Sequence, residues 1–178
     1  YLMASARQWI LSPSDLAMPY GLKPEIGWNY GLNFTQRFKI NYREAYITID
    51  AYRTDFENQV VIDLDNNAQE ISIYNLKGPS YSNTAQFEFN MEPRKRLFVK
   101  MAYRYVDTRV TYTGGLLQKP MVSTHRAFIN FSYETRDAHW QFDFTTQFNG
   151  SKRLPSTQTS PLGYRRANNS PDFYNLIL

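Results

Sequence analysis

Apolar and polar side chains alternate along residues 28–40. With the exception of Gln36, the even positions carry apolar or aromatic side chains, and the odd positions carry Asn, Gly, Thr, Arg and Lys. Successive side chains of a β-strand point to opposite faces, so a period of two predicts a strand with one apolar and one polar face. A helix would mix the two sets on every side.

The same alternation recurs in five further segments, and each of them is long for a strand. These segments are residues 45–56, 80–91, 97–112, 125–135 and 139–150. We expect a seventh strand to begin near Asp172, and we expect residues 1–11 to form the end of an eighth.

The connections between these segments alternate in length. Residues 41–44, 92–95 and 136–138 are short polar turns, and residues 57–79, 113–124 and 151–171 are long. In an antiparallel meander, all short turns then fall at one end and all long loops at the other. The first long connection is expected to hold a small hairpin of residues 59–64 and 70–74, because both stretches are β-rich and flank a turn-prone Asp-Asn-Asn sequence.

Strands of this length and with two different faces are typical of a transmembrane barrel. A tilted strand needs roughly 9–11 residues to cross the hydrocarbon layer, whereas strands of soluble sheets average about five or six. The polar face suits a wet lumen and the apolar face suits lipid. An open sheet cannot stand in lipid, and the smallest bacterial barrels have eight strands. The expected fold is therefore all-β, an antiparallel transmembrane β-barrel meander of about seven or eight strands that forms part of a larger barrel.

A soluble β-protein with long strands is the alternative to this interpretation. Its apolar side chains would pack together in a dry interior between two sheets. The residues whose placement decides between the two are Trp28, Ile47, Phe87, Phe131 and Phe144.

Composition narrows the possible functions. The 178 residues contain no Cys, which excludes disulfides, thiolate metal sites and thiol catalysis. The 20 basic and 16 acidic residues give a net charge of only +4. The one basic run, Arg94-Lys95-Arg96, lies at an expected turn, so nucleic acid is not an expected partner.

Five stretches resemble the C-terminal barrel region of TonB-dependent outer-membrane receptors, in the form common among Bacteroidota. They are residues 28–36 (WNYGLNFTQ), 51–61 (AYRTDFENQVV), 74–87 (YNLKGPSYSNTAQF), 116–133 (LLQKPMVSTHRAFINFSY) and 153–157 (RLPST). The resemblance implies a 22-stranded barrel closed by an N-terminal plug domain. It also implies that residues 1–178 are the C-terminal part of that barrel domain, without the plug and without the final strands.

The resemblance further implies a function in the bacterial outer membrane. Such receptors transport scarce nutrients such as ferric siderophores, haem or cobalamin, with energy from the TonB–ExbB–ExbD complex. The expected surroundings are lipid, lipopolysaccharide and the nutrient ligand. This chain would supply barrel wall, lumen lining and extracellular loops. A passive porin or other unplugged barrel, a soluble β-rich binding protein and an outer-membrane enzyme are the alternatives.

Charged residues alternate onto the polar faces of the predicted strands. We expect them to line the lumen, to pair across neighbouring strands and to contact the plug implied by the resemblance. Simple cross-strand pairing without such a contact is the alternative. The residues are Arg37, Asp50, Glu88, Lys100, Arg104, Arg126, Glu134 and Asp143.

Tyr52, Tyr112 and Arg153 lie near the long-loop ends and are the candidate substrate-binding residues. Tyr and Arg suit anionic, aromatic ligands such as catecholate siderophores, although rim residues that face water or lipopolysaccharide would look the same.

No catalytic residue, metal site or cofactor is expected. His125 and His139 begin different strands at opposite ends of the meander, so no triad or metal spacing joins them. Asp63, Asp65, Asn66 and Glu70 form an acidic group that could hold Ca²⁺, but a solvated turn is the favoured interpretation.

Overall fold

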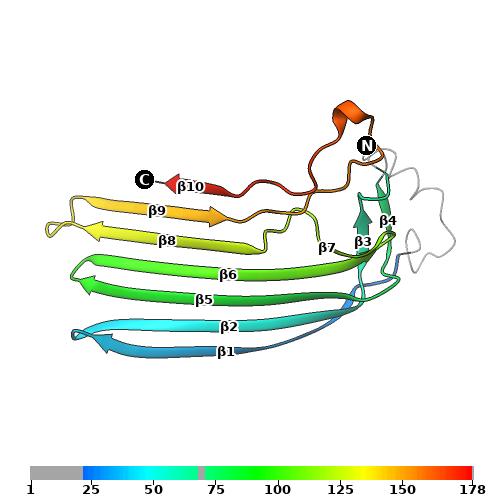
Figure 1. Ribbon diagram of the computed structural model, residues 1–178. Helices are drawn as coiled ribbons and strands as arrows, with labels where there is room; N and C mark the ends of the chain where they lie inside the picture. Colours follow the sequence, from blue (N-terminus) through cyan, green and yellow to red (C-terminus); the bar gives the residue numbers. More distant parts are fainter. Residues whose placement is uncertain (1–21, 68–70, 178) are drawn as a thin grey trace.

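A single twisted antiparallel sheet makes up most of the computed structural model, which describes residues 22–67 and 71–177. The expected strand in residues 1–11 lies outside the described residues. The long strands of the sheet are β1 (Ile26–Ile40), β2 (Arg43–Asn58), β5 (Ser80–Arg94), β6 (Leu97–Tyr112), β8 (His125–Glu134), β9 (Gln141–Asn149) and β10 (Phe173–Ile177). They are hydrogen-bonded in this order, so the expected meander is confirmed (Figure 1).

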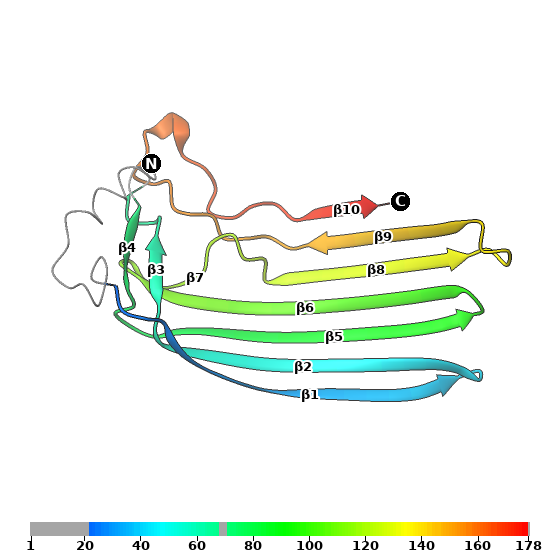
Figure 2. The same ribbon diagram turned by 180° about the vertical axis from the view of Figure 1, so that it is seen from behind.

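Short and long connections fall at opposite ends of the sheet, as the sequence predicts (Figures 1 and 2). The β1–β2 turn consists of Asn41 and Tyr42, which both have positive φ angles of 49° and 63°. Two central residues with positive φ are typical of a type I′ turn, whose twist matches that of the flanking strands. This geometry fixes the β1–β2 register at the short-turn end, where Ile40 lies opposite Arg43.

The long connections hold structure of their own. Strands β3 (Val60–Asp63) and β4 (Ser72–Asn75) form the predicted hairpin as a separate two-stranded sheet. Strand β7 (Gly115–Gln118), which the alternation does not predict, lies within the long connection of residues 113–124 and folds back onto the end of β6. The positive φ of Gly115, 110°, permits this tight reversal. The last connection contains one 3₁₀ turn, η2 (Leu162–Tyr164).

The described residues form no second layer over the large sheet. Most large apolar side chains of the sheet are therefore exposed, including Phe87 (39%) and Phe131 (43%). The buried cluster is small and lies at the long-loop end, where Val61, Val110 and Tyr112 contact one another. This arrangement contradicts a two-sheet sandwich, because its apolar faces would be covered by each other.

Candidate functional site

The eight charged residues singled out in the sequence lie on one face of the sheet. The strand registers place Arg37 opposite Tyr46, and Asp50 in one row with Gln86, Arg104 and Arg126. Along its own strand, each of the eight lies on the same side as the residues of this row. We call this surface the polar face.

The expected pairing of opposite charges occurs only in part. Lys100 forms an ion pair with Glu88, with 3.7 Å between Nζ and Oε2. Asp50 instead accepts a hydrogen bond from the Asn33 side chain, and Asp143 accepts one of 3.0 Å from Gln141. The other expected pairs do not form, because the register places other residues opposite these charges. Alternation predicts the face on which a residue lies but not its cross-strand neighbour.

Arg104 and Arg126 lie directly opposite each other in the β6–β8 ladder. On its other side, Arg104 lies opposite Gln86 of β5. Neither arginine forms an ion pair with any described residue. Like charges at directly opposed positions of an antiparallel pair repel, so this stretch of the polar face has unbalanced positive charge.

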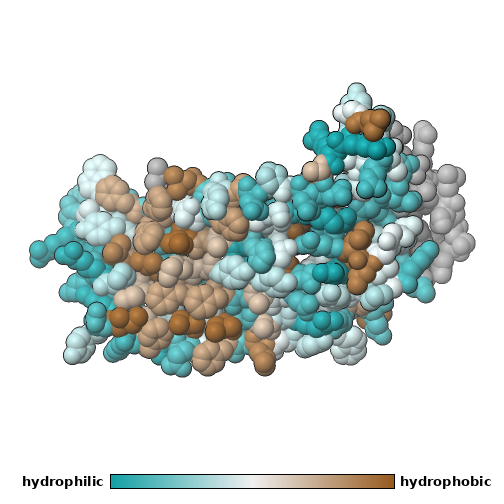
Figure 3. All heavy atoms as spheres, viewed as in Figure 1, coloured by the Kyte–Doolittle hydropathy of each residue, from teal (hydrophilic) through white to brown (hydrophobic). Residues whose placement is uncertain are grey.

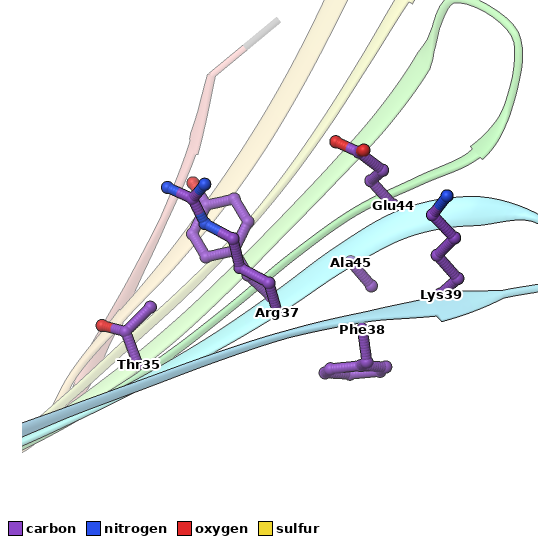
Figure 4. Close-up of a pocket in the computed structure, with 7 residues that line it drawn as sticks. Thr35, Arg37, Phe38, Lys39, Glu44 and Ala45 are labelled. Carbon is purple, nitrogen blue, oxygen red and sulfur yellow. The ribbon is translucent and has the colours of Figure 1, made fainter.

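Two of the hollows formed by the described residues open on the polar face. The larger, about 660 Å³, lies near the short turns and is lined by β1 and β2 residues that include Arg37, Lys39 and Glu44. Figure 4 shows the side chains of these three on the side of the strands opposite Phe38. The smaller, about 190 Å³, lies on β5, β6, β8 and β9. Its lining includes Glu88, Ala102, Arg104, Arg126 and Phe128.

Tyr52 also lies on the polar face, opposite Gly31 of β1. Its side chain is part-exposed, at 44%. A Cβ at position 31 would overlap the Tyr52 ring and the Ala51 carbonyl oxygen. The glycine therefore gives the ring the space to lie across the neighbouring strand, where it covers the β1–β2 ladder.

At the long-loop end, an ion pair joins two connections that are far apart in the chain. Arg153 donates to both carboxylate oxygens of Asp65, at 2.9 and 2.8 Å, and Asp65 also accepts a bond of 2.8 Å from the Ser156 backbone. The side chains of Arg153 and Asp65 are only 15% and 10% exposed. The guanidinium also lies 5.5 Å from the centre of the Tyr112 ring, which is buried. Tyr112 and Arg153 thus make contacts inside the loops.

Asp63 forms a second junction beside the first and is 1% exposed. Its carboxylate accepts hydrogen bonds from the Tyr74 hydroxyl, from the Thr113 backbone and hydroxyl, and from the Asp65 backbone. Burial alone would raise the pKa of Asp63, but these bonds stabilise the ionised form and together hold the pKa below its ordinary value. Asp63 therefore connects the β3–β4 hairpin to the end of β6.

These contacts correct the interpretation of the acidic group as a solvated turn for Asp63 and Asp65, whereas Asn66 is exposed as expected and Glu70 lies outside the described residues. Asp63 and Asp65 are shielded from water and are held by hydrogen bonds and one ion pair. Within the described residues, no group of three or more His, Asp or Glu side chains is placed to hold a metal ion. The sequence gives no sign of the Asp65–Arg153 pairing, because the two residues are 88 positions apart.

The opposite face of the sheet is apolar over the half nearer the short turns. One row across the strands consists of Phe34, Ile49, Phe87, Tyr103, Ala127, Phe148 and Tyr174. Figure 3 shows a brown, apolar area over the half of the sheet nearer the short turns. On β6 it extends from Leu97 to Tyr105, roughly 26 Å at about 3.3 Å per residue.

Towards the long loops, the same face becomes polar. Arg53 donates to both carboxylate oxygens of Asp55 and lies 4.8 Å from the centre of the Tyr81 ring. Tyr30 donates a hydrogen bond of 2.5 Å to Asp55, and Arg109 pairs with Asp107 at 3.1 Å. The apolar area is thus bounded by a belt of tyrosines and ion pairs.

The two histidines are separated as expected. His125 begins β8 at the long-loop side and bonds the Tyr103 hydroxyl at 2.8 Å. His139 lies in the β8–β9 turn, 3.1 Å from Asp137.

Over the part of the chain that the structure describes, no helix has the length and apolar character needed to cross a membrane.

A family model described as "TonB dependent receptor-like, beta-barrel" matches residues 3–175. No curated protein and no solved structure matches the chain significantly.

Proposed function

The chain belongs to the TonB-dependent receptor-like β-barrel family, and from this premise we propose that it forms wall, lumen lining and extracellular loops of an energised outer-membrane transporter. The transported molecule in this proposal is a scarce nutrient such as a ferric siderophore, haem or cobalamin. The family consists of transport receptors rather than enzymes.

The observation that carries the proposal is the division of one sheet into two unlike faces. The apolar area on β6, from Leu97 to Tyr105, has the extent that a tilted strand needs to cross the hydrocarbon layer. Its boundary at Tyr30 and Arg53 has the composition expected where lipid meets headgroups, because tyrosine rings and arginine favour that boundary. In the proposal, the apolar face contacts lipid and the polar face lines the lumen.

In this orientation, the two ends of the sheet face different compartments. The long loops lie outside the cell, beside lipopolysaccharide, and the short turns lie in the periplasm, as in other outer-membrane barrels. Energy reaches the receptor through TonB, with ExbB and ExbD in the inner membrane. The charged residues of the polar face contact the plug domain that such receptors contain.

We assign two roles to the candidate ligand-binding residues. Tyr52 presents a part-exposed ring to the lumen and is placed to contact an aromatic ligand directly. Tyr112 and Arg153 support the binding surface from within, since Arg153 is paired with Asp65 and lies against the Tyr112 ring. They hold the loops in the shape that the ligand meets.

Uptake by cells that carry the full-length receptor tests the proposal. We expect accumulation of at least one labelled ferric siderophore, haem or cobalamin, and we expect a protonophore or loss of TonB to abolish it. The purified receptor in liposomes should not allow swelling by small sugars. Sugar-driven swelling without an energy source would identify a passive porin and contradict the proposal.

A further inference from the structure

Arg104 and Arg126 form an arginine pair whose positive charge is not neutralised by the surrounding sheet. They are directly opposed on the polar face. Glu88, diagonal to Arg104 in the β5–β6 ladder, and Asp50, in the same row as Arg104, have other partners. Glu88 pairs with Lys100 and accepts a bond of 2.6 Å from Gln86, and Asp50 accepts from Asn33.

The surroundings of the pair form a small hollow. Ala102 lies between Glu88 and Phe128 in the neighbouring row, and its short side chain leaves space next to both arginines. The resulting cavity of about 190 Å³ is lined by both arginines, by Gln86, Glu88 and Gln147, and by the Phe128 ring. The Glu88 carboxylate is offset by its ion pair with Lys100, whose Nζ lies 5.7 Å from the centre of that ring, so the charge of the two arginines stays in excess.

We infer that the arginine pair binds one carboxylate or phosphate group in this hollow. Guanidinium groups present paired N–H donors that match the two oxygens of a carboxylate or phosphate, and an anion between them turns mutual repulsion into attraction. The volume holds such a group with its nearest atoms and is too small for a whole siderophore. The inference rests on the proposed function, because it gives a lumen surface its ligand chemistry.

The anion can be a group of a transported ligand or an acidic side chain from elsewhere in the receptor, and one set of measurements distinguishes them. Tm is measured in detergent for the full-length receptor and for its variants R104Q and R126Q. The control is R136Q, which changes an exposed turn residue. The concentration of inorganic phosphate is increased while chloride keeps the ionic strength constant. R104K serves as the variant that keeps the charge but loses the paired donors.

In both cases we expect R104Q and R126Q to lower Tm, whereas R136Q leaves it unchanged. If the anion comes from outside, phosphate raises the Tm of the wild-type receptor, and each glutamine variant weakens phosphate binding by about tenfold or more, with R104K intermediate. If the receptor's own acidic side chain occupies the site, phosphate has no effect on the wild type and the Tm losses remain.

The inference is overturned if phosphate does not change the Tm of the wild type and both glutamine variants have a Tm equal to or higher than that of the wild type. That result is expected if the two arginines only repel each other and bind no anion. Energised uptake is measured on the same proteins. Absence of uptake by the wild type would contradict the proposed function, whatever the phosphate response.

Discussion

Asp65 and Arg153 form a bidentate ion pair across 88 positions of sequence and thereby join the β3–β4 hairpin to the last long connection. Both side chains are largely shielded from water. Loss of one partner leaves the other as a shielded, unpaired charge, so we expect D65N or R153Q to destabilise this junction by roughly 2–4 kcal/mol. Hydrogen exchange of residues 151–171 measures the loss as faster local opening.

The surface pair Arg109–Asp107 provides the matched control, because its arginine is 48% exposed. R109Q should change exchange by much less, since exposed ion pairs contribute little to stability. Equal effects of R153Q and R109Q would contradict a structural role for the shielded pair.

The Asp63 junction should be sensitive to acid. Its folded-state pKa is below the ordinary value, so its contribution to stability is complete above the unfolded-state pKa, about 4, and is lost as pH falls through the lower folded-state pKa. We expect protease cleavage of the β3–β4 hairpin to increase as pH falls through that range. D63N should cleave faster at neutral pH and should show little further change on acidification. Identical pH profiles for D63N and the wild type would exclude this mechanism.

Gly31 should be intolerant of a side chain. Because a Cβ there would overlap the Tyr52 ring and the Ala51 carbonyl oxygen, we expect G31A to destabilise the β1–β2 pairing by about 1–3 kcal/mol. Urea unfolding in lipid vesicles measures the change. Gly114 is the control, because a Cβ at that position meets no atom within 4 Å. If G31A leaves the free energy of unfolding unchanged, β1 and β2 can move apart to accommodate the added methyl group, and the prediction is wrong.

Adjacent residues of β2 allow a test of which face meets lipid. Ile49 lies on the apolar face and Thr48 on the polar face. Arginine on a lipid-facing position near the bilayer centre costs about 2–4 kcal/mol, whereas a lumen-facing position tolerates it. We therefore expect I49R to lower stability in lipid vesicles and T48R to have little effect. The reverse order would place lipid against the polar face.

The sequence predicts the strands and the ends at which the turns lie, because alternation over ten or more residues matches the period of a strand and no helical period. It also assigns Arg37 and Asp143 to the polar face, since each alternates with the apolar positions of its own strand. It does not predict that Arg104 meets Arg126, because a shift in register would give each residue another neighbour.

The contacts of the long connections could not be predicted in the same way. The positions of Asp63, Asp65 and Arg153 depend on how the loops fold over the end of the sheet. No periodic pattern encodes such contacts. The sequence also does not predict the fold-back of β7, because four residues are too few for a period to be recognised.

Strand β6 changes partners along its length, with β8 beside residues up to Tyr105 and β7 beside Arg109 to Tyr112. The long-loop end of the sheet is therefore built on a separate ladder from the rest of it. Insertions or deletions between β7 and β8 can remodel that end without shifting the alignment of the long strands. Under the proposed function, this division would let ligand recognition diversify while the membrane-crossing part of the wall keeps one geometry.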